Sequence, residues 1–437
     1  MLLSTLREKI AASDFIKNAA KLMAGTVIAQ VITVMASPLL TRLYTPADFG
    51  TFSFYSSIVA VITIVASGRY DMAVVVAKNF KSAINILFLA AAFILLTSIL
   101  TFGAAFAFRQ ELNTLLHVNN GWALVWLLPL TVLFLGIYQL IAYWANRQKD
   151  FSIIAASKVL QNILNVSFAI GYGFLFKSQL GLVLGFFIGS LAAFSTLLIK
   201  YFNPLLFFRK EVSRVRLKYV MSYHRQFPAY SMPSSFLDTF SNQAPIFFIT
   251  IFFGNVLAGY YGFAIRIISI PVTLIGASIA QVFFQKLSEE FRNKGNCTKL
   301  IYQTWGSLAL IGLLPCVLLI LLGPQLFSFI FGEEWGQAGR MAQYLALMQF
   351  FVLVSSPTST AMIVFGAQQV SFFFGLASAV YRPLALYIGY LLGDFNTGLI
   401  ILVICEILQI ISYNLLILHY NKKLSSATVK SNLHQAH

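Results

Sequence analysis

Residues 82–108 read SAINILFLAAAFILLTSILTFGAAFAF, a run of apolar and small polar residues without a single charged side chain. About 20 apolar residues suffice for a helix that crosses the hydrocarbon core of a bilayer, so this segment can span a membrane with some tilt. The rest of the chain is similar, because 59% of its 437 residues are hydrophobic and only 10% are charged. Soluble proteins carry about 25% charged residues, which excludes an ordinary cytosolic enzyme and a disordered chain.

Twelve apolar segments of this kind are separated by short polar loops, which predicts an all-α integral membrane protein with twelve transmembrane helices. The expected spans are 20–41, 47–67, 82–108, 122–145, 153–176, 180–202, 228–253, 257–283, 300–323, 338–364, 369–392 and 396–419. The longest and most basic loop divides them six and six. The expected organisation is a six-helix bundle over 1–202, a basic cytoplasmic loop at 203–226, a second six-helix bundle over 227–420 and a cytoplasmic tail at 421–437.

The net charge of +16 is explained by the way Lys and Arg are distributed between the two sides of a membrane. With the N-terminus placed inside, 24 of the 30 Lys and Arg residues fall on the inner side and four on the outer side. Cytoplasmic loops of membrane proteins collect Lys and Arg, so both termini are expected in the cytoplasm of a bacterial inner membrane. A nucleic-acid partner is therefore not needed to explain the basic character, and none is expected.

The sequence shows no nucleotide-binding motif, and its five histidines lack the spacing of a metal site. We therefore expect no metal and no cofactor. The loops on the predicted outer side are short, whereas a membrane enzyme that builds sugar polymers needs a substantial outer loop. The chain is accordingly predicted not to be an enzyme.

Polar and charged residues inside the predicted spans are the candidates for function, because a charge within a bilayer faces a protein interior or a water-filled cavity. Arg266 lies on one helix face with Ser269 and Thr273, and Arg382 lies on a similar stripe of small and polar residues. Candidates for a substrate-binding cleft are Arg266, Arg382, Gln30, Ser269, Thr273, Gln161 and Asn165. Asp238 and Glu406 are candidates for coupling transport to protons or sodium ions.

Each of these residues also has a structural interpretation. Stripes of small and polar residues let membrane helices pack closely, which explains any single stripe without a substrate. The two arginines can form ion pairs with Asp238 or Glu406. A functional interpretation follows from arginine chemistry, because a guanidinium stays charged and binds phosphate through two parallel hydrogen bonds.

Three stretches resemble bacterial polysaccharide flippases: PLLTRLYTPADFG at 38–50, GYYGFAIRIISIP at 259–271 and FSFIFGEEW at 327–335. Their order and the twelve-span plan extend the resemblance over nearly the whole chain. The resemblance implies the multidrug/oligosaccharidyl-lipid/polysaccharide (MOP) exporter superfamily, whose fold is two six-helix bundles around a V-shaped central cleft, as in MATE transporters.

The O-antigen and capsule branch of that superfamily moves undecaprenyl-diphosphate-linked oligosaccharides from the inner to the outer leaflet by alternating access. The resemblance therefore implies such an oligosaccharide as substrate, membrane lipid as surroundings, and polysaccharide polymerase or assembly proteins as partners. Two alternatives remain: a proton- or sodium-coupled multidrug exporter of the same superfamily, and a membrane polysaccharide polymerase or ligase. The multidrug branch typically has an acid in its first helix, and the segment 26–37 contains none.

Overall fold

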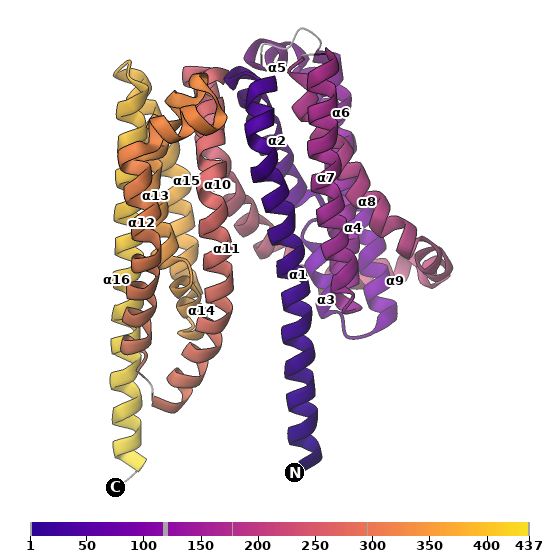
Figure 1. Cartoon of the computed structure of the whole chain (residues 1–437). Helices are drawn as coiled ribbons and strands as arrows, with labels where there is room; N and C mark the ends of the chain where they lie inside the picture. The colour runs from indigo at the N-terminus through magenta and orange to yellow at the C-terminus, as the bar shows by residue number, and fades with distance from the viewer. Residues whose placement is uncertain (1, 117–120, 177, 295, 436–437) are drawn as a thin grey trace. The chain divides into compact units, whose positions relative to one another are not determined.

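The computed structural model describes residues 2–116, 121–176, 178–294 and 296–435, and the described chain is built from helices (Figure 1). In the first half these are α1 (Leu2–Leu43), α2 (Pro46–Ala66), α3 (Tyr70–Val76), α4 (Phe80–Ala107), α5 (Arg109–Leu116), α6 (Gly121–Arg147), α7 (Phe151–Phe176), α8 (Leu180–Phe208) and α9 (Arg214–Tyr223). In the second half they are α10 (Met232–Phe253), α11 (Asn255–Lys294), α12 (Thr298–Phe331), α13 (Gly336–Ser355), α14 (Ala361–Val364), α15 (Gln368–Leu391) and α16 (Phe395–Gln435). Short turns of 3-10 or π-helix lie at Arg209–Glu211, Phe227–Ser231 (η2), Glu333–Trp335 and Thr358–Thr360.

The number of membrane spans agrees with the expected twelve. Eleven of the described helices are long and apolar enough to cross a membrane, and a bent pair makes a twelfth. The bent pair is the predicted span 338–364, which breaks after Ser355 and turns by 47° before Thr358. Pro357 lies in this break, where it cannot donate a backbone hydrogen bond and would clash with the preceding turn of a continuous helix. The prediction of an all-α membrane protein is confirmed.

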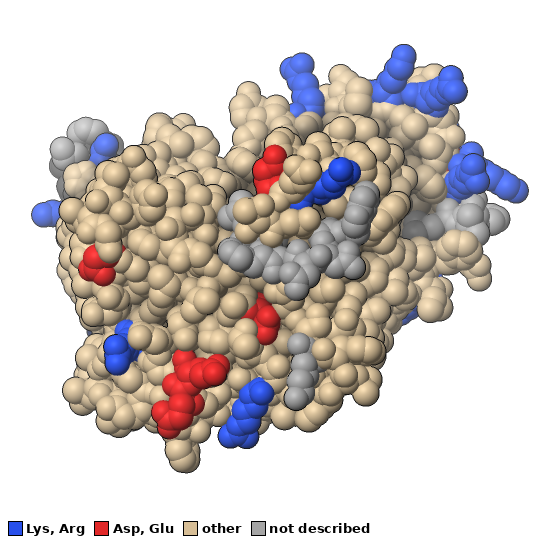
Figure 2. Space-filling view, turned by 90° about the horizontal axis from the view of Figure 1, so that it is seen from above, with Lys and Arg blue, Asp and Glu red and all other residues tan. Residues whose placement is uncertain are grey.

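The chain forms two compact units, Met1–Thr239 and Phe240–His437. The predicted boundaries at 203–226 and 421–437 stay predictions, and residues 436–437 of the tail lie outside the described chain. Figure 2 shows a face of the molecule on which most of the surface belongs to uncharged residues. Along the membrane-spanning helices, large apolar side chains such as Met35, Leu175 and Ile199 are exposed, as expected of a protein whose sides contact lipid rather than water.

In the first unit, the junction between α1 and α2 is fixed by specific hydrogen bonds. The Thr45 hydroxyl accepts a hydrogen bond from the backbone N–H of Asp48, and the Asp48 carboxylate accepts one from the backbone N–H of Thr45. This reciprocal capping starts α2 at Pro46. The neighbouring Tyr44 is buried and donates its hydroxyl proton to the carbonyl of Ala169 on α7, at 2.6 Å. The segment 38–50 thus attaches α1 to α7.

Helices α7 and α8 pack closely because glycines on α8 leave room for the backbone of α7. A Cβ atom at Gly189 would lie 2.6 Å from the carbonyl oxygen of Gln161 and 2.9 Å from Cβ of Asn165. We therefore expect Gly189→Ala to lower the free energy of unfolding by about 1–3 kcal/mol, the usual cost of overpacking. Gly171→Ala on α7 is the matched control, because no atom lies within 4 Å of the added Cβ. Thermal unfolding of the purified protein measures both, and equal stabilities would contradict the close contact.

In the second unit, an aromatic cluster joins α11 to the end of α12. The ring of Phe263 lies 4.8 Å from that of Phe331 and 4.5 Å from that of Trp335, measured between centroids. Trp335 is 1% exposed. Two of the three stretches that resemble flippases, 259–271 and 327–335, therefore pack against each other, and this contact holds the start of α11 in place.

Candidate functional site

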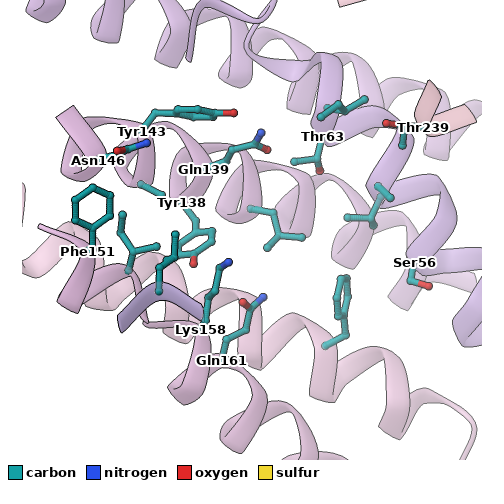
Figure 3. A pocket seen from close by; sticks show the side chains of 18 residues that line it. Ser56, Thr63, Tyr138, Gln139, Tyr143, Asn146, Phe151, Lys158, Gln161 and Thr239 are labelled. Carbon is teal, nitrogen blue, oxygen red and sulfur yellow. The ribbon is translucent and has the colours of Figure 1, made fainter. Parts of the chain in front are cut away.

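The first unit contains a cavity of about 660 Å³ that lies between α2, α6 and α7 (Figure 3). Its polar lining comes from four helices: Ser56 and Thr63 of α2, Tyr138, Gln139, Tyr143 and Asn146 of α6, Lys158 and Gln161 of α7, and Thr239 of α10. The remaining lining is largely apolar and includes Val59, Leu135, Ile154 and Phe186. Hydroxyl and amide groups on an apolar wall can bind a sugar through hydrogen bonds while the walls exclude water.

Lys158 is the one charged residue among the described residues that line this cavity. It lies in the second turn of α7 and is half-buried, and its amine lies 3.5 Å from the hydroxyl of Thr26 on α1. Within the described chain its amine has no carboxylate within ion-pair distance. Figure 3 shows the Lys158 amine and the Gln161 amide on the same side of α7, directed into the cavity. A cation without a protein carboxylate in a polar cavity favours an anionic ligand.

The other two amide candidates, Asn165 and Gln30, are not among the residues that line this cavity. Asn165 packs against α8, where a Cβ atom at Gly185 would lie 3.1 Å from its side-chain oxygen. Gln30 of α1 is half-buried, and its side-chain oxygen has no hydrogen-bond partner within the described chain. Of the three amides predicted for a cleft, the structure thus places Gln161 alone on the cavity wall.

In the second unit, Arg266 lies half-buried on α11. The Ser269 hydroxyl, one turn further on, donates a hydrogen bond to the Arg266 carbonyl oxygen at 3.2 Å. Thr273 continues the same face and is exposed, with its hydroxyl bonded to the Ile270 carbonyl oxygen. The predicted polar stripe of α11 is therefore present, and its hydroxyl groups bond to the backbone of their own helix.

Arg382 of α15 forms an ion pair with Glu406 of α16, in which the arginine Nε donates to a carboxylate oxygen. A second guanidinium nitrogen donates to the side-chain oxygen of Asn242 on α10, at 3.0 Å. The pair is largely buried, with 14% of the arginine side chain and 10% of the glutamate side chain exposed. The structural interpretation of Arg382, an ion pair with an acidic residue of the spans, therefore agrees with the structure.

Asp238 is exposed on α10 and forms no ion pair within the described residues.

Sequence reasoning missed Lys158 as a site residue and counted it among the basic residues of the inner side. A signal was present, because Lys158 lies inside the predicted span 153–176 and three residues before Gln161. Residues three apart share a helix face, so the two side chains point the same way. Tyr138 and Gln139 gave no signal of their own, because neighbouring residues of an apolar helix do not reveal which one faces a cavity.

Comparison with known proteins gives the class of this fold. The structure resembles the lipid II flippase MurJ in an inward closed conformation, with a TM-score of 0.72 and 13% identity over 93% of this chain and 90% of the other. It also resembles an inward-facing multidrug resistance MATE family transporter of the MOP superfamily, with a TM-score of 0.63 and 14% identity over 92% and 96% of the two chains. The protein is therefore a multi-pass membrane protein whose fold is that of these two structures.

The family follows from sequence. Residues 39–340 match the family model described as polysaccharide biosynthesis protein, and the chain belongs to this family. It is 23% identical to the capsular polysaccharide biosynthesis protein CapF of Staphylococcus aureus, over 82% of this chain and 87% of CapF. It is 24% identical to the succinoglycan biosynthesis transport protein ExoT of Rhizobium meliloti (strain 1021), over 89% of this chain and 76% of ExoT. The predicted resemblance to a bacterial polysaccharide family is confirmed by this match, and the fold is the one seen in the flippase MurJ and in the MATE transporter.

Proposed function

We propose that this protein is a flippase that moves an undecaprenyl-diphosphate-linked oligosaccharide from the inner to the outer leaflet of the bacterial cytoplasmic membrane, with both termini in the cytoplasm. The observation that carries the proposal is the polar cavity of the first unit, with Lys158 as its cation and amide and hydroxyl groups around it. A diphosphate provides the negative charge that suits Lys158, and the sugar provides hydroxyls for Gln161 and Tyr138. The capsule and succinoglycan proteins that it resembles support a glycan substrate.

In this proposal Arg266 is a second positively charged residue, besides Lys158, that contacts the diphosphate of the substrate. It stands on a polar helix face, half-buried in α11, in the manner expected of a charge that faces a substrate pathway. The alternative of a proton- or sodium-coupled multidrug exporter assigns the central role to Asp238 or Glu406. The ion pair between Glu406 and Arg382 leaves that carboxylate engaged, which favours the flippase.

Replacing Arg266 with alanine tests this assignment. Hydrogen bonds to charged groups contribute about 1.5–3 kcal/mol, so flipping should fall by roughly ten- to a hundredfold. Arg266→Lys should retain part of the rate, because lysine keeps the charge but loses the paired hydrogen bonds. The measurement is flipping of an undecaprenyl-diphosphate-linked oligosaccharide by the protein in liposomes, with surface polysaccharide measured in cells. Normal polysaccharide from Arg266→Ala at normal protein level would remove Arg266 from the substrate pathway.

A further inference from the structure

Asp71 lies in the first turn of α3 and is only 1% exposed. The turn before it holds Gly68 and Arg69 in the left-handed region, with φ of 60° and 59°. Left-handed backbone is uncommon for a residue other than glycine, so the fold forces the chain into this turn. The turn directs the Asp71 carboxylate into the protein, where it accepts hydrogen bonds from its neighbour's backbone N–H at Met72 (3.0 Å) and from the side-chain amide of Gln139 (3.2 Å).

The charge of Asp71 is incompletely compensated. The nearest guanidinium nitrogen of Arg69 lies 3.8 Å from the carboxylate, beyond hydrogen-bond distance. Another nitrogen of Arg69 points to the sulfur of Met72, at 2.7 Å, and its Nε is buried without a hydrogen-bond partner within the described chain. Burial raises the pKa of the Asp71 carboxyl above its ordinary value, and the Arg69 charge, a hydrogen bond from Ser67 and the backbone N–H of Met72 offset only part of that rise.

In the described chain, the helices packed against α3 place no second positively charged side chain next to the Asp71 carboxylate. From α6, Arg147 donates to the carbonyl oxygens of Val74, Val75 and Ala77 at the other end of α3. From α4, Phe93 packs on Tyr70, and the Tyr70 hydroxyl bonds to the carbonyl of Met221. The turn η2, which also contacts α3, contains no charged residue, so within the described chain Arg69 is the one charge that acts directly on Asp71.

Gln139 connects this carboxyl to the cavity, because it both donates to Asp71 and lines the cavity wall (Figure 3). An ionised carboxylate can only accept hydrogen bonds, whereas a protonated carboxyl also donates one. Proton uptake by Asp71 therefore weakens its hold on the Gln139 amide, and the amide becomes available to a ligand in the cavity.

We propose that Asp71 is a proton-binding site and that Gln139 couples its protonation to ligand binding in the cavity of the first unit. The proton site stands on the geometry of Asp71 alone, whereas the coupling rests on the proposed function of the cavity. The site differs from the acids singled out in the sequence, since Asp238 is exposed and Glu406 is paired with Arg382.

The proton site is tested by infrared titration of the full-length protein in detergent. We expect a carboxylic-acid C=O band that appears on acidification with a midpoint above the ordinary aspartate pKa of about 3.9 and is absent from Asp71→Asn. Glu211→Gln should leave the band unchanged, because hydrogen bonds from Arg216 and Lys81 lower the pKa of Glu211. A band that persists in Asp71→Asn, or a midpoint at the ordinary value, overturns the proposal.

Two measurements on the wild type do not depend on how the variant folds. Dicyclohexylcarbodiimide, which modifies protonated buried carboxyls, should label Asp71 increasingly as the pH falls, as mapped by mass spectrometry. The melting temperature should rise over the same range, since a carboxyl whose pKa is higher in the folded than in the unfolded chain binds its proton more tightly when folded. Labelling that avoids Asp71 at all pH values contradicts the proton site.

The coupling is tested with inorganic pyrophosphate as the probe, bound to the purified protein at pH 5 and pH 7. For each protein we take the affinity for pyrophosphate at pH 5 divided by that at pH 7. We expect this ratio in the wild type to differ at least about fivefold from the ratio in Asp71→Asn and from the ratio in Gln139→Leu. Ionisation of the probe is common to all three proteins and cancels in this comparison. Equal ratios refute the coupling. If no form binds pyrophosphate, the proposed function of the cavity fails, and the infrared result still decides the proton site.

Discussion

Replacing Lys158 with glutamine is expected to lower flipping of a lipid-linked oligosaccharide by roughly ten- to a hundredfold. Lys158 provides the one charge among the described residues that line the cavity, and glutamine keeps a polar, slightly shorter side chain but removes that charge. A hydrogen bond to a charged group contributes about 1.5–3 kcal/mol, and each 1.4 kcal/mol is about a tenfold change. Flipping by the purified protein in liposomes, with a diphosphate-linked substrate, measures the loss.

Two variants make this prediction specific. Lys158→Arg keeps the charge and should retain most of the rate, since a guanidinium also binds phosphate. Lys149→Gln removes a charge from an exposed turn outside the cavity and should flip as the wild type does. If Lys158→Gln and Lys149→Gln lose equal amounts of activity, the effect comes from the overall basic charge, and the cavity is not the binding site.

The membrane fold could be predicted because the bilayer imposes a simple requirement on sequence. A helix that crosses it must be long and apolar, and segments such as 82–108 satisfy this requirement without any knowledge of their neighbours. The break in the predicted span 338–364 was harder to place. Most prolines inside the predicted spans, such as Pro129 and Pro271, lie within continuous helices, whereas the helix ends at Ser355, just before Pro357. Tertiary contacts decide which proline interrupts a helix.

The candidate site was less predictable, because helical periodicity gives the face of a residue but not the helix that it meets. The stripe of Arg382 was visible in the sequence, but its partner on α16 was one of two acids that were equally available. The burial of Asp71 depends on the left-handed turn at Gly68 and Arg69, and sequence pattern gives no reason for an arginine to adopt that conformation. Lys158 was misplaced because positive charge near a span was attributed to membrane orientation.

Replacing Glu406 with leucine is expected to destabilise the protein by about 3–5 kcal/mol, the cost of breaking a buried ion pair by removing one partner. Without Glu406, the guanidinium of Arg382 stays largely buried and loses its carboxylate partner. Of the two hydrogen bonds described above, only the one to the neutral side chain of Asn242 is left. The double variant Arg382→Met with Glu406→Leu should recover most of that loss, because two apolar side chains need no charge compensation. Thermal unfolding of the single and double variants measures the recovery.

The same pair of variants separates a structural from a substrate-binding role for Arg382. The surface ion pair of Lys81 and Glu211 provides the control, since Glu211→Gln should leave the melting temperature nearly unchanged. A double variant that regains stability and flips substrate at the wild-type rate shows that Arg382 serves the fold, and the predicted contact of Arg382 with the diphosphate is then wrong. A double variant that is stable but inactive keeps Arg382 in the substrate pathway, where Glu406 holds it in position until a phosphate replaces the carboxylate.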